Sequence, residues 1–268
     1  MGRWEVRVTE LRRRFDEVAE LYDRARPRYP PALVEELARV AGLGPGSRVL
    51  EIGPGTGQLT VPLAGYGCLI TCVELGASMA AVARRRLSGF PRVDVVVSDF
   101  EGWEPPAEPY DLVVSATAFH WIDPAVRTAK AARALRPGGR LAVVATEHVA
   151  GGSTEFFARA QRCYERWDPA TPPGLRLLPS SRTATDTAEF EESPWYGPVA
   201  VGRFEQDIDY TTDGYLDVLR TYSNHRALEP AAREGLFGCL RELVDGSYGG
   251  RVTKRYLHEL IVAVRAET

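Results

Sequence analysis

Three glycines that follow a short apolar run are the first residues whose spacing could serve chemistry. Gly53, Gly55 and Gly57 lie in the segment VLEIGPGTGQLTVPLA, residues 49–64, which passes from an apolar stretch into a helical pattern. Glycine has no Cβ, so such a turn lets a ligand touch the main chain, and open α/β sheets bind ligands at the carboxyl ends of their strands. Because glycine-rich turns also occur without any ligand, the motif alone is a weak indicator.

Two carboxylates near this turn indicate which ligand it would bind. Glu74 ends the next apolar run, about twenty residues after the first glycine, where a carboxylate accepts both hydroxyls of a ribose; an exposed strand-end side chain is the alternative. A dinucleotide site has the spacing Gly-x-Gly-x-x-Gly, but here the third glycine comes one residue early. Glu51, just before the turn, would repel a diphosphate and suit an ammonium group. The pattern therefore favours a nucleoside with a methionine tail over a dinucleotide.

The elements that must position these residues are parallel strands. Between residues 47 and 146, apolar runs alternate with helical stretches, which is typical of parallel strands buried on both faces. The runs are SRVLEIG, CLITCVEL, VDVVVSD, YDLVVSATA and GRLAVVAT, and helices fit ASMAAVARRRLSG and DPAVRTAKAARALRPGG. Pro137, Gly138 and Gly139 are expected to form a loop before the fifth strand. The alternation predicts a doubly wound, Rossmann-like α/β sheet.

The segments on either side of this region complete the predicted architecture. A helix is expected over residues 8–22, an extended connector over 24–31 because of its prolines, and a second helix over 31–43. Beyond residue 197, a strand pattern, two helices and a final strand pattern would complete a mostly parallel, seven-stranded sheet whose last strand is antiparallel. Residues 150–197 contain one helix and a Pro/Ser/Thr-rich stretch, an insertion typical of a lid or pocket wall.

Composition limits the classes of partner. The 268-residue chain carries 33 basic and 36 acidic side chains, for a formal net charge of -3, so no overall field attracts nucleic acid or an anionic membrane. A small-molecule substrate is therefore expected, and a macromolecular one is disfavoured. No apolar run reaches the ~18 residues of a membrane span, and the first residues lack an apolar signal core. These observations predict a cytoplasmic protein.

Cysteine and histidine spacing gives no sign of a metal site. The cysteines are Cys68, Cys72, Cys163 and Cys239. They lack the paired spacing of a zinc site, so we expect structural thiols and no metal. The histidines outside the fourth strand, at positions 148, 225 and 258, show no ligand spacing either, and the sequence assigns them no role.

Together, the ordered motifs resemble those of class I S-adenosylmethionine-dependent methyltransferases. The motifs are Glu51–Gly57, Glu74, Ser98–Asp99–Phe100, Asp111–Ser115 and Leu135–Gly139, within residues 12–146. The resemblance implies that the three glycines approach the methionine and sugar of S-adenosylmethionine and that Glu51 orients its amino-acid part. Glu74, with Leu75 beside it, would bind the ribose. Asp99 and Phe100 would hold the adenine, with a helix-capping or turn role as the alternative for Asp99.

The N-terminal stretch resembles small-molecule members of this family, including the trans-aconitate methyltransferase group. The resemblance implies that Tyr22, Arg26 and Tyr29 lie in a segment that covers the cofactor. A tyrosine ring attracts a sulfonium cation, which makes Tyr22 a candidate catalytic residue, and Arg26 could bind the cofactor's carboxylate through two hydrogen bonds. A surface arginine and tyrosines packed on the sheet are the alternative.

The segment Phe119–His120–Trp121 ends the fourth strand, whose carboxyl end faces the transferred methyl group in the family that the motifs resemble. His120 is the main candidate for a base, with substrate binding or a purely structural role as alternatives. Phe119 and Trp121 are candidates for contacts with the substrate.

Aromatic residues in the insertion are expected to hold the acceptor. Tyr164, Trp167 and Trp195 are the candidate contacts, which favours a partly apolar or planar molecule, and Glu165 is a second candidate base. The arginines of this insertion either bind a carboxylate or phosphate, or form a solvated helix face.

We interpret the chain as one domain. It comprises an N-terminal lid at residues 1–30, a cofactor-binding core at 31–149, a substrate cap at 150–197, and strands and helices at 198–268 that complete the sheet. The predicted function is methyl transfer from S-adenosylmethionine to an O, N or C atom of a small molecule, by in-line displacement with or without help from a base. A non-catalytic S-adenosylmethionine-binding protein and an NAD-linked oxidoreductase are the alternatives. Neither nucleic acid nor a membrane is an expected partner.

Overall fold

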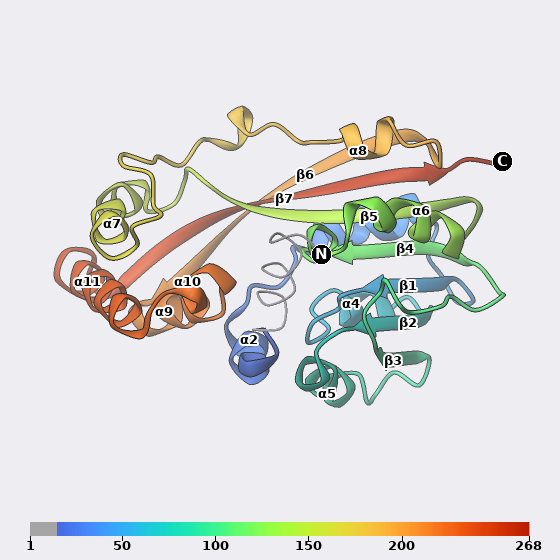
Figure 1. Ribbon diagram of the computed structural model, residues 1–268, viewed down its shortest axis with the longest axis horizontal. Coiled ribbons are helices and arrows are strands. Elements are labelled where there is room, and N and C mark those ends of the chain that lie inside the picture. The colour runs from blue at the N-terminus through green and yellow to red at the C-terminus, as the bar shows by residue number, and fades with distance from the viewer. Residues whose placement is uncertain (1–14, 268) are drawn as a thin grey trace.

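A seven-stranded mixed sheet forms the centre of the molecule. The computed structural model describes residues 15–267, and within them the strand order is β3-β2-β1-β4-β5-β7-β6 (Figure 1). The strands are β1 (Arg48–Ile52), β2 (Leu69–Glu74), β3 (Val93–Val97), β4 (Tyr110–Ala116), β5 (Leu135–Val149), β6 (Tyr196–Thr211) and β7 (Arg251–Arg265). Strands β1 to β5 pair in parallel, and β7 is antiparallel to both β5 and β6. This confirms the predicted doubly wound sheet with its antiparallel last strand.

Helices cover both faces of the parallel strands. The helices are α2 (Ala19–Ala25), α3 (Pro31–Ala41), α4 (Thr60–Ala64), α5 (Ala77–Arg86), α6 (Pro124–Ala134), α7 (Thr154–Trp167), α8 (Ala188–Glu191), α9 (Thr212–Arg220), α10 (Ser223–Ala227) and α11 (Pro230–Tyr248), with 3₁₀ turns η1 (Asp16–Val18), η2 (Phe119–Trp121) and η3 (Ser180–Arg182). Apolar side chains of α3, α4 and α5 share one core with the strands, and those of α6 and α8 share another. We call β1 to β4, with α3 to α6, the sheet half.

Strands β6 and β7 extend beyond the sheet half and carry a second group of helices (Figure 1). Side chains of α7, α9 and α11 form a separate core with the adjoining ends of these two strands, in which Phe156, Tyr215 and Leu240 are buried. We call α7, α9, α10 and α11, with these strand ends, the helical half. Helix α2 contacts both α5 and α9, so it lies between the two halves.

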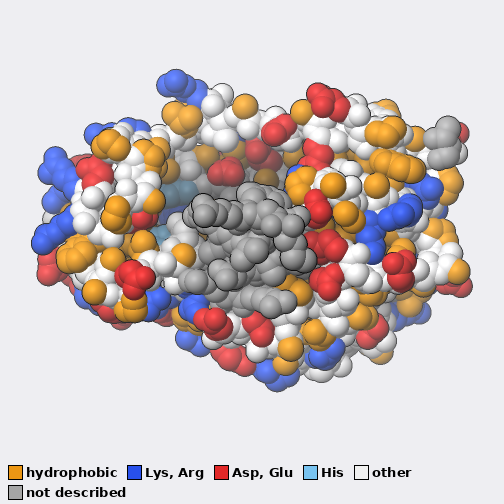
Figure 2. Space-filling view, viewed as in Figure 1, with side chains coloured by type: hydrophobic (Ala, Val, Ile, Leu, Met, Phe, Trp, Pro, Cys, Tyr) orange, Lys and Arg blue, Asp and Glu red, His pale blue; other side chains and the backbone are white. Residues whose placement is uncertain are grey.

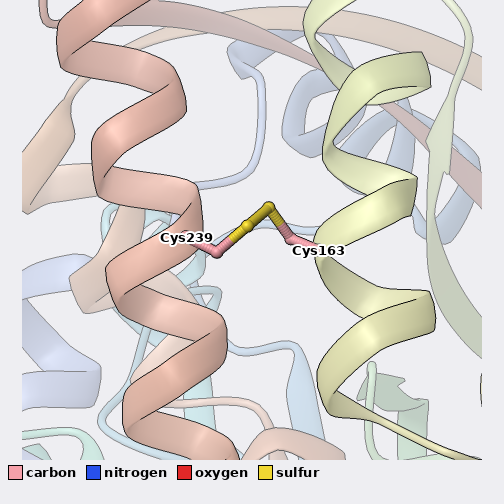
Figure 3. Close-up of a disulfide and its surroundings, with 2 residues drawn as sticks. All are labelled: Cys163 and Cys239. Atoms are coloured by element: carbon pink, nitrogen blue, oxygen red, sulfur yellow. A yellow bond between two sulfur atoms is a disulfide. The ribbon is translucent and has the colours of Figure 1, made fainter.

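The cysteines correct one expectation from the sequence. Cys68 and Cys72 are buried free thiols, as expected, but Cys163 of α7 and Cys239 of α11 form a disulfide where thiols were predicted (Figure 3). The two residues are 76 positions apart in the sequence, and their Cα atoms lie 5.8 Å apart because α7 and α11 pack against each other. The pairing depends on the packing of these two helices, which spacing along the chain does not reveal.

Most local elements lie where the sequence predicted them. Helix α2 ends at Ala25, before an extended connector, as expected, while residues 1–14, which include the start of the predicted first helix, lie outside the described part. The prediction of a loop at residues 137–139 is wrong, because this segment belongs to β5. Tyr110 pairs with Leu135 and Leu112 with Arg140, so the proline and glycines form an irregularity inside the strand instead of a loop before it.

Candidate active site

A cavity of about 720 Å³ extends from the carboxyl ends of β1, β2 and β4 to the helical half. Figure 2 shows this face of the molecule, with histidine side chains visible in a hollow beside the helices on the left. Thirteen of the predicted site residues line the cavity, namely Tyr22, Arg26, Tyr29, Glu51, Gly53, Gly55, Glu74, Leu75, Asp99, Phe100, His120, Trp121 and Tyr164. Five do not, namely Gly57, Phe119, Glu165, Trp167 and Trp195.

The glycine turn brings the main chain of Gly53 and Gly55 to the cavity. Gly53, Gly55 and Gly57 have φ values of 66°, 59° and 87°, in the left-handed region that favours glycine. A Cβ on Gly53 would lie 2.5 Å from the Cβ of Ala118, so no larger residue fits there. Gly57 instead faces Leu87 behind the turn, so its contribution is to the packing of the turn.

Two buried carboxylates flank this turn. Glu74, 8% exposed, accepts hydrogen bonds from the backbone N–H groups of Gly55 and Gly76, both over 2.9 Å. Glu51 is 1% exposed, and within residues 15–267 its Oε2 has no hydrogen-bond partner. Burial raises the pKa of each carboxyl to about 7. A buried acceptor without a partner is costly, so the site is suited to a ligand that brings a donor or a positive charge.

Asp99 and Phe100 close the cavity beyond β3. The Asp99 carboxylate accepts a hydrogen bond from the backbone N–H of Gly102, which agrees with the turn-capping alternative, while the residue still lines the cavity. The buried Phe100 ring stacks on Trp103 with centroids 6.4 Å apart. Its position provides a flat apolar wall beside a carboxylate, an arrangement that suits a purine.

The residues that precede α3 line the cavity between its two ends. Tyr22 faces the glycine turn, and Tyr29 Oη lies 3.3 Å from Thr117 Oγ1. Arg26, however, turns towards the helical half: its Nε and Nη2 donate to the hydroxyl and the carbonyl of Thr221 over 2.8 Å and 3.2 Å. The guanidinium therefore lies at the boundary between the two ends of the cavity.

Thr117 was not singled out by the sequence. It follows β4, lines the cavity, and has a φ of 55°, the sole positive φ of a non-glycine residue in the described chain. Such strained residues cluster at functional sites. Its hydroxyl donates to the Ala116 carbonyl over 2.8 Å and contacts Tyr29, so it links the end of β4 to the N-terminal segment.

Two of the three residues of η2 face the cavity. His120 and Trp121 line the cavity with ring centroids 4.7 Å apart, whereas Phe119 is buried against Phe190 on the other side. Burial of the imidazole and the nearby charge of Arg127 lower the pKa of His120. The imidazole is therefore neutral near pH 7, the state that a proton acceptor requires.

Of the insertion candidates Tyr164, Glu165, Trp167 and Trp195, Tyr164 reaches the cavity, where its hydroxyl lies 3.0 Å from His225 Nε2. Trp167 packs on Gly235 of α11, and Trp195 is 41% exposed. Glu165 accepts a hydrogen bond from the backbone N–H of Gly174, outside the cavity. Of the five insertion arginines, Arg176 lines the cavity and the other four do not.

The last strand contributes side chains that sequence reasoning missed. Lys254, Tyr256 and His258 alternate along β7 and all line the cavity, opposite Thr146 and His148 of β5. His258 Nδ1 lies 2.9 Å from Thr146 Oγ1. The signal was the period-two spacing Lys-x-Tyr-x-His, which places these three side chains on one face of the strand.

Tyr222 and His225, which follow α9, were missed as well, and they line the cavity opposite β7. Burial lowers the pKa of His225 and His258 to about 4 and that of His148 to about 2, so these imidazoles are neutral at physiological pH. No group of three or more His, Cys, Asp or Glu in residues 15–267 is arranged to hold a metal ion.

Proteins similar to this chain include several that are named as methyltransferases. A family model described as a methyltransferase domain matches residues 49–139. A demethylmenaquinone methyltransferase of Clavibacter sepedonicus is 30% identical over 227 residues, which cover 82% of this chain and 90% of that protein. An uncharacterized methyltransferase of Mycobacterium bovis is 36% identical over 130 residues, 48% of this chain, and the match spans about half of that relative's length (51%).

A solved structure has the same fold. A candidate type II methyltransferase of Anaeromyxobacter dehalogenans superposes with a TM-score of 0.62 at 24% identity, over 90% of this chain and 97% of that one. The chain belongs to the S-adenosylmethionine-dependent methyltransferase family, whose methyl donor is S-adenosylmethionine. The finer resemblance to the trans-aconitate group has no specific support in these comparisons. Among the described helices, none is both long and apolar enough to cross a membrane.

Proposed function

We propose that this chain transfers a methyl group from S-adenosylmethionine to a small molecule that binds at the helical end of the cavity. The observation that carries the proposal is the continuity of the cavity, which has the glycine turn and Glu74 at one end and Tyr164 and Tyr222 at the other. Its volume of about 720 Å³ is in the range of small-molecule sites, roughly 300–1,000 Å³. The Clavibacter relative is named for methyl transfer to demethylmenaquinone, which favours a small-molecule acceptor here.

The residues at the sheet end fit the cofactor. Each oxygen of Glu74 uses one lone pair on a backbone N–H and keeps another for a ribose hydroxyl. The partnerless Oε2 of Glu51 suits an ammonium group, and Phe100 with Asp99 suits an adenine. A diphosphate would meet two buried carboxylates here, which disfavours NAD.

The chemistry requires little beyond alignment. The cofactor supplies an activated methyl group whose leaving group is a neutral thioether, so the protein has no need of an acid to protonate it. Alignment can contribute about 7–11 kcal/mol and one positioned base roughly 10²–10⁴-fold. Tyr22, Tyr29 and Thr117 surround the junction between the two ends of the cavity and would exclude water there. Neutral His120 is the candidate base, whereas Glu165 lies outside the cavity and is not proposed for this role.

Calorimetric binding of S-adenosylhomocysteine tests the cofactor site. We expect the wild type to bind it and not to bind NAD. Glu74→Gln should weaken binding by roughly 10- to 100-fold, since hydrogen bonds to a charged group contribute about 1.5–3 kcal/mol. Glu242→Gln, an exposed acidic residue of α11 outside the cavity, is the matched control. Equal affinity of the Glu74 variant and the wild type would contradict the ribose role, and binding of NAD would contradict the cofactor assignment.

Turnover tests the transferase activity itself. Incubation with a methyl-labelled cofactor and a metabolite library, followed by mass spectrometry, should yield a product heavier by one methylene unit. His120→Ala should lower the rate while S-adenosylhomocysteine affinity stays nearly constant. Binding of the cofactor without any labelled product would favour the non-catalytic alternative.

A further inference from the structure

Within residues 15–267, Lys254 is a buried cation without an anionic partner. The residue lies on β7, lines the cavity and is 4% exposed. Its ammonium donates a hydrogen bond to Tyr222 Oη over 2.9 Å and lies 5.0 Å and 4.7 Å from the ring centroids of Tyr222 and Tyr256. Among residues 15–267, no carboxylate oxygen lies within 4.0 Å of Lys254 Nζ.

Lys130 is a second buried lysine of this chain, and it has an anionic partner. It is also 4% exposed, but its ammonium donates to the Glu101 carbonyl over 2.9 Å and lies 3.9 Å from the Glu104 carboxylate. Removing an ammonium from water costs several kcal/mol, which an opposite charge in good geometry offsets. Lys254 has aromatic rings and a phenol around it but lacks that opposite charge.

Arg26 also contacts the ring of Tyr222. Its guanidinium carbon lies 4.3 Å from the Tyr222 ring centroid, and two of its nitrogens donate to Thr221. In the described part of the chain, the third nitrogen, Nη1, has no hydrogen-bond partner, and no carboxylate lies within 4.0 Å of this guanidinium. Two cations, Lys254 and Arg26, therefore lie beside the Tyr222 ring at the wall of the cavity.

We propose that the acceptor carries an anionic oxygen group, a carboxylate or a phosphate, which Lys254 and Arg26 hold beside Tyr222. The inference rests on the proposed function, since it names the class of molecule that the helical end binds. A third cation, Arg176, also lines this end, while Asp168 at the end of α7 is its sole carboxylate within residues 15–267. The field at the helical end is therefore positive, and a carboxylate or phosphate would supply the opposite charge that Lys254 lacks.

The walls around these cations are aromatic. Phe157 lies edge-on to His148 with ring centroids 4.4 Å apart, and Tyr164 and Tyr256 line the same end. Aromatic walls favour a planar apolar body. The probes are therefore aromatic anions, each with a neutral partner of similar shape: benzoate with benzamide, and phenyl phosphate with phenol.

Calorimetry on protein saturated with S-adenosylhomocysteine tests the inference. At least one anion should bind about 10-fold or more tightly than its neutral partner, and the two pairs distinguish a carboxylate site from a phosphate site. Lys254→Met should lower that anion's affinity by about 10-fold or more and change the affinity of the neutral partner little. Arg241→Gln, which removes a positive charge from an exposed pair with Asp213 outside the cavity, should leave the preference unchanged.

The outcomes separate the two proposals. Absence of S-adenosylhomocysteine binding by the wild type would overturn the proposed function. Normal binding of it together with equal affinities for anions and neutral partners, or with no binding of either anion, would overturn this inference alone. The inference would also be overturned if the Lys254 and Arg241 variants lost the preference for the anion over its neutral partner to the same degree. Should Lys254→Met fail to fold, Arg26→Gln replaces it, with S-adenosylhomocysteine binding as the criterion of folding.

Discussion

The two ends of the cavity carry opposite charges, and different kinds of element supply them. At the sheet end, Glu51 and Glu74 lie at the ends of short parallel strands, where the strand order brings them together. At the helical end, Lys254 lies within the long β7 and Arg26 on the connector after α2. A cationic cofactor and an anionic acceptor would therefore be directed to different ends of one cavity by charge, before any specific contact forms.

The two halves also differ in what supports them. The sheet half has strands with apolar cores on both faces, whereas the helical half joins the sheet through β6 and β7 and has a disulfide between α7 and α11. Replacing both cysteines, Cys163→Ala with Cys239→Ala, should lower the free energy of unfolding by about 2–4 kcal/mol, because the bond closes a long loop of the unfolded chain. S-adenosylhomocysteine affinity should stay within about twofold, since the cofactor end lies in the other half.

Urea unfolding of the double variant checks this difference. A reductant should destabilise the wild type to a similar degree and leave the variant unaffected. A strong loss of cofactor affinity in the folded variant would show that the two ends are energetically coupled and would break the comparison.

The sheet end was largely predictable from the sequence, and the reason is local. Its glycines and carboxylates lie at strand ends, and parallel strands place those ends along one edge, so a linear pattern specifies the three-dimensional neighbours. The exceptions are instructive. Gly57 shares the glycine spacing but faces Leu87, and Phe119 shares the strand end with His120 but faces the core. Spacing gives the turn but not the direction of each side chain.

The helical end was not predictable in the same way. Tyr222 and His225 lie at α10, Lys254 on β7 and His148 on β5. Their proximity depends on how α9, which contacts α10, packs against β7. The disulfide has the same origin. The sequence could have shown the alternation along β7, but without the sheet order it does not show that this face meets a cavity instead of a core.

Acidity should act on the cofactor end in a defined direction. The pKa of Glu51 and of Glu74 is raised by burial from 4.5 to about 7, so both carboxyls ionise as the pH rises through neutrality. We expect S-adenosylhomocysteine affinity to increase by roughly 10-fold between about pH 6 and about pH 8, because an ionised carboxylate attracts the ligand's ammonium. Calorimetry at constant ionic strength measures S-adenosylhomocysteine affinity at each pH. Glu51→Gln should reduce the increase in affinity between these pH values.

The same groups determine a stability change of opposite sign. A carboxyl whose pKa is raised on folding binds a proton more tightly in the folded state than in the unfolded state. Its contribution is present below the usual value of 4.5 and is lost as the pH rises through about 7. The ligand-free protein should therefore become less stable over this interval while its cofactor affinity rises. A cofactor affinity that falls with pH would contradict the proposed role of both carboxylates.

At the acceptor end the pH dependence should be smaller and reversed. Burial raises the pKa of Tyr222, but the charges of Lys254 and Arg26 outweigh this and bring it down to about 8. The other charged or titratable groups that face it are His225 and the tyrosines at positions 164, 210, 215 and 256. His225 is already neutral at this pH, and the pKa of each of these tyrosines is raised, so Tyr222 is the group of this set that changes charge near pH 8.

A Tyr222 phenolate would neutralise Lys254 and compete with an anionic acceptor. Benzoate or phenyl phosphate affinity should therefore fall by roughly threefold or more between about pH 7 and about pH 9, in the direction opposite to cofactor affinity at the sheet end. Tyr222→Phe should abolish this fall while Lys254 keeps the preference for anions, and the tyrosinate absorbance that titrates near pH 8 should disappear from this variant. Two results together would contradict this prediction: an anion affinity of the wild type that is independent of pH, and a tyrosinate absorbance change near pH 8 that persists in the Tyr222 variant. They would show that no phenolate competes for Lys254 and that the two ends of the cavity do not respond oppositely to pH.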